Sequence, residues 1–326
     1  MENRELERRV SDAKKLLNDV KSEISKKVVG QTSMIDGLLM GIIAGGHVLV
    51  EGVPGLAKTL AVRALSEVLT IDFKRIQFTP DLLPADLTGT MIYRQQTGEF
   101  VARKGPVFTN IVLADEINRA PAKVQAALLE SMAEKQVTIG DNTYKLPDPF
   151  FVLATQNPIE QEGTYQLPEA QLDRFVLKLK ITYPSPAEEL DILKMMGSER
   201  EITINRVLNT ITLGQIRKAA ESITVDERIE KYIVSIVTAS RATDQKHLSF
   251  IRYIEYGASP RATIYLYRCA RVKALFEGRT FVLPEDVKAV AYDVLRHRIV
   301  LSYEAQAEEL STDDVIKDIL AAVSVP

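Results

Sequence analysis

The chain has 326 residues, a length that favours two domains. Hydrophobic residues make up 46% of it and charged residues 26%, a composition that can build a core and excludes a disordered chain. The net charge of -3 argues against non-specific binding to nucleic acid, and the single cysteine excludes an internal disulfide. The sequence has no apolar leader and no apolar run long enough to span a membrane, so we expect a soluble, cytoplasmic protein.

Short apolar runs alternate with helical patterns from the N-terminus to about residue 183. The runs show no polar alternation, which is typical of strands buried on both faces. Strands that alternate with helices in this way predict an α/β fold, with a parallel sheet covered by helices on both faces. The apolar runs lie at residues 48–50, 111–116, 150–157 and 176–181, and the helical patterns follow Thr59 and Arg119.

Two segments interrupt this alternation, and each has short runs on either side of a polar turn. Such runs predict β-hairpins at residues 91–105 and at about 136–147. A proline-rich cluster at residues 183–186 then marks a domain boundary. Because the segments beyond it have helical patterns, we expect an α/β domain over residues 1–184 and a small helical domain over residues 185–326.

The first functional motif follows the first apolar run and opens a helix, which is the context that a P-loop requires. Its glycines let backbone N–H groups wrap phosphates, and the helix N-terminus adds partial positive charge. Lys58 would neutralise the β- and γ-phosphates, and Thr59 would offer a hydroxyl ligand to Mg²⁺. Ala57 stands where the motif has its last glycine, so its methyl group must fit beside the phosphates. The predicted ATP-binding residues of this motif are Gly52, Val53, Pro54, Gly55, Leu56, Ala57, Lys58, Thr59 and Leu60.

The second motif is an apolar strand that ends in paired carboxylates. Asp115 would hold Mg²⁺ through water, and Glu116 would orient and deprotonate the attacking water. A solvated acidic strand end, which is common in α/β folds, is the simpler alternative. The position of the pair, downstream of the P-loop by roughly one extra strand–helix unit, favours the catalytic interpretation.

The P-loop resembles that of the MoxR family of AAA+ ATPases, alanine included, and residues 115–120 match the acidic motif of that family. Residues 77–89 are similar to the insert within helix 2 of this clade, so that residues 77–105 would be an insert with a hairpin. The resemblance covers nearly the whole chain. It implies a P-loop AAA+ core with a C-terminal all-α lid, ATP and Mg²⁺ as cofactors, and self-assembly into a ring, by family precedent a hexamer.

The resemblance also implies roles for single residues outside the two motifs. Val28 and Val29 would line the adenine pocket, and Asn157 would act as sensor 1 by hydrogen-bonding the attacking water or the γ-phosphate. Arg174 resembles the arginine finger, which reaches the γ-phosphate bound by the neighbouring subunit. Arg261 resembles sensor 2 at the start of a lid helix.

Simpler alternatives exist for several of these residues. Asn157 precedes a proline and suits an ordinary turn. A local ion pair with Asp173 or Glu169 would also account for Arg174. Arg119 is either a further inter-subunit arginine or a surface charge.

For the biological role, the resemblance implies a chaperone-like remodelling or maturation factor for partner proteins, often ones with a von Willebrand factor A domain. ATP binding is then expected to close the lid on the core, and the hairpins are expected to push on the partner. Two alternatives stay open, a DNA-translocating or remodelling motor and a magnesium-chelatase-like metal-insertion subunit. The neutral to acidic tips of both hairpins argue against DNA binding. A nucleotide-gated scaffold with little turnover is disfavoured by Glu116, Asn157 and Arg174 together.

Overall fold

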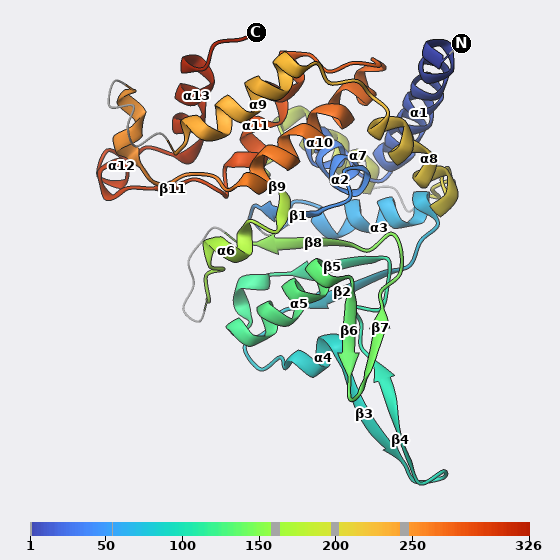
Figure 1. The fold of residues 1–326 in the computed structure, drawn as a ribbon. Helices are drawn as coiled ribbons and strands as arrows, with labels where there is room; N and C mark the ends of the chain where they lie inside the picture. The colour runs from blue at the N-terminus through green and yellow to red at the C-terminus, as the bar shows by residue number, and fades with distance from the viewer. Residues whose placement is uncertain (1, 54, 158–163, 197–201, 242–247) are drawn as a thin grey trace.

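The structure is a computed structural model and describes residues 2–53, 55–157, 164–196, 202–241 and 248–326 (Figure 1). Its centre is a five-stranded sheet in the order β2–β5–β8–β1–β9, in which every neighbouring pair runs parallel. This confirms the predicted parallel α/β fold. The strands are β1 (His47–Glu51), β2 (Phe73–Gln77), β5 (Ile111–Asp115), β8 (Phe151–Gln156) and β9 (Phe175–Lys180).

Four of these strands lie where apolar runs predicted them, whereas β2 was not predicted. Ile76 is the only fully buried side chain of β2, because this strand lies at the edge of the sheet and pairs only with β5. An edge strand needs few apolar residues, so it leaves no apolar run in the sequence. The omission affects the candidate site, because β2 also carries polar side chains to it.

Helices bury both faces of the sheet, as its apolar strands require (Figure 1). Successive strand residues point to opposite faces, and the buried side chains divide into two clusters in the same way. Val48 and Val50 belong to the cluster that includes α1 (Glu2–Ser25), α2 (Thr32–Ile43) and α3 (Lys58–Leu69). Leu49, between them, belongs to the cluster that includes α5 (Ala122–Glu134).

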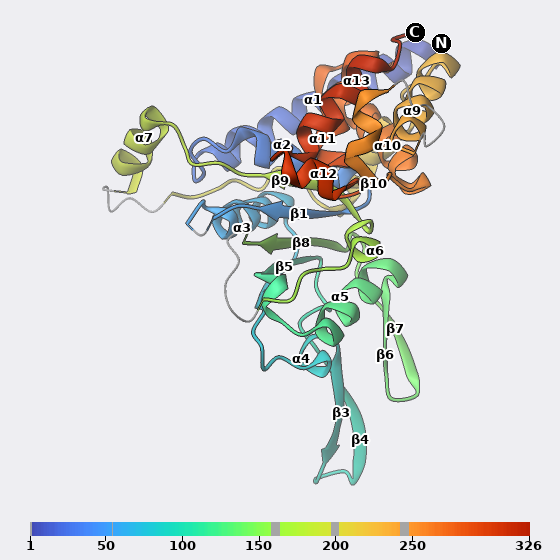
Figure 2. The ribbon, with the colours of Figure 1, turned by 90° about the vertical axis from the view of Figure 1, so that its left-hand side faces the viewer.

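Two hairpins extend from the part of the molecule that contains α5 (Figures 1 and 2). Strands β3 (Gly89–Arg94) and β4 (Glu99–Lys104) follow the short helix α4 (Pro84–Thr88), and they form the hairpin that projects farther from the body. Tyr93 and Phe100 face each other across this hairpin with ring centroids 5.2 Å apart, and both are mostly exposed. The second hairpin consists of β6 (Gln136–Ile139) and β7 (Asn142–Lys145).

The chain after residue 183 is mainly helical, as predicted, but it also forms one small antiparallel sheet. The two strands of that sheet have three and two residues, which is too short to give a recognisable alternation in the sequence. No helix in the described ranges is long and apolar enough to cross a membrane. The elements are α7 (Pro186–Met196), α8 (Thr210–Glu221), α9 (Glu227–Ala239), η2 (Ser249–Tyr253), β10 (Ile254–Tyr256), α10 (Pro260–Glu277), α11 (Pro284–Leu295), β11 (Val300–Leu301), α12 (Tyr303–Ala307) and α13 (Thr312–Ala322).

The helices α8, α9, α10, α11 and α13 are joined to the sheet layer by a continuous hydrophobic core. Helix α1 packs against α3 on the sheet and also against α8 and α10, so it bridges the two parts of the chain. Helix α2 likewise contacts β1 and β9 as well as α8 and α10. The sheet and these helices therefore form one packed body.

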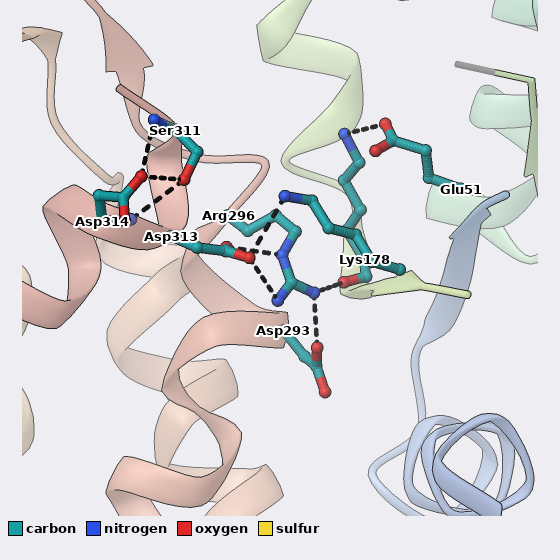
Figure 3. Close-up of polar contacts among 8 residues, drawn as sticks. Glu51, Lys178, Asp293, Arg296, Ser311, Asp313 and Asp314 are labelled. Carbon is teal, nitrogen blue, oxygen red and sulfur yellow. Dashed lines mark hydrogen bonds and ion pairs between the residues drawn. The ribbon is translucent and has the colours of Figure 1, made fainter. Parts of the chain in front are cut away.

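A polar joint fastens the same helices to β9 (Figure 3). The side chain of Arg296, at the end of α11, is only 9% exposed, and its guanidinium donates to the carbonyl oxygen of Lys178 at 2.7 Å. The same guanidinium pairs with Asp293 at 2.6 Å and with Asp313 of α13 at 2.8 Å. Because removing one partner would leave a buried charge unpaired, this joint fixes the position of α11 and α13 on the sheet.

We expect His47 to make the fold sensitive to mild acid. Its ring is buried, bonds the carbonyl oxygen of Met132, and accepts the backbone N–H of Val152 at Nδ1, so that nitrogen must be unprotonated. Burial lowers the pKa of His47 from 6.5 to about 4. Between these values the unfolded chain binds a proton that the folded chain does not, so stability falls as the pH drops from 7 to 5, by roughly 2 kcal/mol for one such group.

Urea unfolding at pH 7 and pH 5 checks this expectation, with His47→Gln as the comparison because its amide can donate and accept without titrating. The variant should lose less stability between the two pH values than the wild type. Equal losses in both proteins would contradict the assignment.

Candidate active site

The P-loop occupies the turn between β1 and α3, at the carboxyl-terminal edge of the sheet. Gly55 has φ +88° and Ala57 has φ 55° and ψ 19°, both in the left-handed region. This conformation explains why the P-loop motif has a glycine at the place of Ala57, since a Cβ in the left-handed region costs on the order of 1 kcal/mol. The Lys58 ammonium donates to the carbonyl oxygen of Gly52 at 2.7 Å, which holds the cation inside the loop.

A cleft of about 600 Å³ opens in front of this loop, within the usual size of a site for a small-molecule ligand. Val53 does not line it and packs against the hydrophobic core instead, and Pro54 lies outside the described residues. The cleft contains most of the predicted nucleotide-site residues, namely Val28, Val29, Gly52, Gly55, Leu56, Ala57, Lys58, Thr59, Leu60, Asp115, Glu116 and Asn157.

The paired carboxylates lie at the end of β5 and are fixed by Thr155 of the neighbouring strand β8. The Thr155 hydroxyl donates to Oδ1 of Asp115 at 2.6 Å and accepts the backbone N–H of Glu116 at 2.8 Å. Glu116 has φ 56° and ψ 51°, an uncommon conformation for a residue with a side chain. A single buried hydroxyl therefore sets the position of both acids.

Two side chains of β2 also reach the acids. Arg75 donates to Oδ2 of Asp115 at 2.7 and 3.0 Å, and the Gln77 amide donates to Oε2 of Glu116 at 2.9 Å. Both residues line the cleft. Neither residue was predicted, because the sequence did not predict the strand β2, which carries both. The only available signal was Gln77, a polar residue at the end of a short segment of β-forming residues.

Arg119 lies in a short 3-10 turn, η1 (Ile117–Arg119), directly after the acids. Its guanidinium is 3.1 Å from Oε2 of Glu116, and its side chain is 45% exposed. Within one chain it is therefore an ion-pair partner of Glu116.

Lys58 and the two acids place opposite charges in the cleft. Burial lowers the pKa of the Lys58 ammonium from its ordinary value, while the carboxylates of Asp115 and Glu116 act in the opposite direction. Anionic phosphates entering beside Lys58 would act in the same direction as these carboxylates and favour the protonated ammonium. The donor set suits a nucleotide bound with a divalent cation.

The two remaining predicted arginines lie at the opposite edge of the sheet. Arg174 directly precedes β9, so it stands at the amino-terminal end of that strand, whereas the P-loop follows the carboxyl-terminal end of the parallel strand β1. From Arg174 to Lys180, at the end of β9 nearest the cleft, the backbone spans roughly 20 Å. That separation is beyond the reach of an arginine side chain, and neither Arg174 nor Arg261 lines the cleft.

Asp173, next to Arg174, is held by the C-terminal helices. Its carboxylate accepts from Arg298 at 2.9 Å and from the Ser259 hydroxyl at 2.9 and 3.0 Å, and it lies 3.5 Å from the guanidinium of Arg261. The Arg298 side chain is 1% exposed. Asp173 is thus occupied by α10 and its surroundings, and the guanidinium of Arg174 makes no hydrogen bond or ion pair with any other described residue.

Comparisons with known proteins agree with the fold and the site. The family described as "ATPase family associated with various cellular activities (AAA)" matches residues 47–177, and the AAA lid domain matches residues 252–319. The chain is 48% identical to the Mycobacterium tuberculosis protein "Chaperone MoxR1" over 93% of this chain and 81% of that protein. It is 33% identical to "Protein MoxR" of Methylorubrum extorquens over 93% of each.

Among solved structures, that of a candidate ATPase from Cytophaga hutchinsonii is similar, with a TM-score of 0.93 and 51% identity over 100% of this chain and 99% of that one. A parallel AAA sheet, a P-loop and an AAA lid together define an ATPase of the AAA type. The chain belongs to the MoxR family of AAA+ ATPases, as the sequence motifs predicted.

We expect Thr155→Val to impair hydrolysis more than binding. The substitution keeps the size of the side chain but leaves the Glu116 N–H without its acceptor and Asp115 without its donor. The turnover number should fall by about tenfold or more, while the affinity for ATP changes little. Steady-state ATPase assays and nucleotide titrations measure both quantities. Thr155→Ser, which keeps the hydroxyl, is the control, and equal activity of the two variants would refute the assignment.

Proposed function

We propose that this ATPase hydrolyses ATP at a site shared by two copies of the chain in a ring, and that it uses the resulting motion to remodel or mature partner proteins. The observation that carries the first part is the position of Arg174, across the sheet from its own cleft and without a partner among the described residues. A finger in that position can act only on another copy.

Within one chain, the P-loop N–H groups and Lys58 would bind the phosphates, and Val28 and Val29 would contact the adenine. Asp115 and the Thr59 hydroxyl would hold Mg²⁺ together with nucleotide oxygens and water. The described residues contain no group of three or more His, Cys, Asp or Glu side chains that could hold a metal, so the nucleotide would supply part of its ligand set. The ion would supply charge neutralisation at the β- and γ-phosphates.

Glu116 would be the general base, with Asn157 orienting the attacking water. Within one chain, Glu116 is engaged by Gln77 and Arg119. Both contacts are to Oε2, so they occupy an oxygen that would otherwise accept the proton of the attacking water. Release from Gln77 and Arg119 would therefore accompany activation.

Arg174 and Arg261 would complete the site of the neighbouring copy by stabilising the charge that develops on its γ-phosphate. A contact in which one edge of a subunit meets a different edge of the next is heterologous, and closure of such contacts gives a ring. The resemblance to AAA+ proteins suggests six subunits. Because α10 starts beside Asp173 and away from the cleft, Arg261 would act on the neighbouring copy, whereas Ile192 and Met195 of α7 line the cleft of their own chain.

For the partner, the name of the M. tuberculosis relative supports a chaperone-like role. The client proposed here is a protein with a von Willebrand factor A domain, and the β3–β4 hairpin is the proposed contact because Tyr93 and Phe100 form an exposed aromatic pair on it. Lys104, which would suit a DNA phosphate, instead lies over the rings of Phe108 and Tyr144. That contact disfavours a DNA motor.

We expect Arg174→Ala to bind ATP with unchanged affinity and to lose turnover by about a thousandfold, the usual effect of removing an arginine finger. Lys58→Ala should lose ATP hydrolysis at its own P-loop but keep Arg174 available for the site of the neighbouring copy. Mixing the two inactive proteins should restore ATPase activity, because some interfaces then combine an intact P-loop with an intact finger. Activity of Arg174→Ala as a monomer would overturn the shared site.

The hairpin has its own test. Tyr93→Ser/Phe100→Ser should reduce binding to a von Willebrand factor A domain client by tenfold or more, since exposed aromatic pairs often dominate interfaces. ATPase activity should stay within about twofold of wild type, because the pair lies far from the cleft. Gln95→Ser/Gln96→Ser, in the turn of the same hairpin, is the control, and undiminished client binding by the aromatic variant would contradict the proposed contact.

A further inference from the structure

Helix α7 lies at the rim of the nucleotide cleft and has one face without a partner. Ile192 and Met195 line the cleft, whereas Leu190 and Leu193 are 51% and 67% exposed. These two leucines are three residues apart, so they are neighbours on the helix surface. No other helix or strand of the described chain packs extensively against α7, which stands apart from α8–α13 in Figure 2.

The charge on α7 is mainly acidic. Glu188 and Glu189 lie in its first turn, and Asp191 follows. The Glu188 carboxylate is held by Ser185, and Asp191 has only a long contact with Lys194 at 3.8 Å. Glu189 is exposed and makes no side-chain hydrogen bond or ion pair with another described residue. The helix therefore presents two leucines beside an uncompensated carboxylate.

A groove of about 530 Å³ lies between the C-terminal end of α2 and the helices α8 and α10. Its apolar and cationic lining is complementary to the leucines and the carboxylate of α7. Ile43, Ala44 and Val272 contribute apolar surface to it, and Ile264 on α10 is 50% exposed there. The shape is that of an apolar floor between helices, which is how amphipathic helices are commonly received.

The groove also has a cationic rim, formed by Lys135, Arg217, Arg268 and Arg271, against the single carboxylate of Glu221. Arg217 is bound to the carbonyl oxygen of Ile42 at 2.8 Å, and Arg271 to the Tyr267 hydroxyl at 2.7 Å. Lys135 and Arg268 make no side-chain hydrogen bond or ion pair with the rest of the described chain. Two cations are thus available to an acidic ligand.

The groove continues the edge that carries Arg174 and Arg261. Arg261, Ile264 and Arg268 follow one another at spacings of three and four residues along α10, so they share one face of that helix. About 10 Å separates Arg261 from Arg268 along the helix axis. If Arg261 of one copy enters the cleft of a second copy, helix α7 of the second copy, which lies at the rim of that cleft, comes close to Ile264 and Arg268 of the first.

We propose that the groove between α2, α8 and α10 receives helix α7 of the neighbouring copy. Leu190 and Leu193 pack against Ile264 and the apolar floor, and Glu189 pairs with Arg268 and Lys135 at the rim. The inference rests on the shared-site ring proposed above, and it adds the surfaces that hold the ring together. Since α7 and α10 lie toward opposite ends of the molecule in Figure 2, the contact is heterologous, as a ring requires.

The test uses two differently tagged chains with one added cysteine each, Leu193→Cys and Ile264→Cys, mixed with a non-hydrolysable ATP analogue and treated with a short bismaleimide. The native Cys269 is fully buried and does not compete. Covalent dimers that contain both tags should form in the mixture and not in either protein alone. Phe100→Cys, 67% exposed on the projecting hairpin, replaces Leu193→Cys as the control and should give none.

Charge reversal supplies a second readout that does not depend on linker geometry. Glu189→Lys and Arg268→Glu should each raise the concentration needed for assembly by about tenfold, and the two together in one chain should largely restore it. Light scattering separates the possible failures. If the wild type forms no oligomer with nucleotide, the shared-site ring is wrong. If it forms the oligomer but neither the cross-link nor the charge rescue appears, the α7 docking site alone is wrong.

Discussion

The parallel direction of the five strands is the constraint on which the site depends. Because all carboxyl ends lie at one edge, the P-loop after β1, the acids after β5 and Asn157 after β8 converge on one cleft without any long loop. The same direction places the residue before β9 at the other edge. A catalytic group in that position is separated from its own cleft by the length of a strand, so the polarity of the sheet itself supports a site divided between two copies.

The loop that carries Arg174, the proposed finger, is held in place at that edge. Asp173 is anchored by a nearly inaccessible arginine, Arg298, and by Ser259 at the start of α10, while the adjacent Arg174 stays without a partner among the described residues. Burial lowers the pKa of the Arg298 guanidinium, and Asp173 opposes that effect. A buried pair of this kind contributes orientation more than stability. One carboxylate thus links the loop of the proposed finger to the position of the C-terminal helices.

Much of this site could be predicted from sequence, because the P-loop and the acid pair follow strands whose apolar runs are unmistakable. Three contributing residues could not be predicted. Arg75 and Gln77 lie on an edge strand with one buried residue, which leaves no apolar run. Thr155 lies inside an apolar run, where nothing marks its hydroxyl as functional. The location of Arg261 was equally inaccessible. It depends on how α10 packs against α1 and α2 and on the contact of Arg261 with Asp173, and such long-range packing leaves no local pattern.

Helix α1 has a mechanical consequence. It packs against α3 and against α8 and α10, and together with the Arg296 joint it ties the described C-terminal helices to the sheet as one body. In a closed ring of such rigid subunits, relative motion can occur only at the interfaces between subunits. Tightening one interface around a nucleotide must be compensated by rotation at the others, because the ring has to stay closed. A change of geometry at one site would then force a change at the other sites, so rigid-body geometry would couple the sites around the ring.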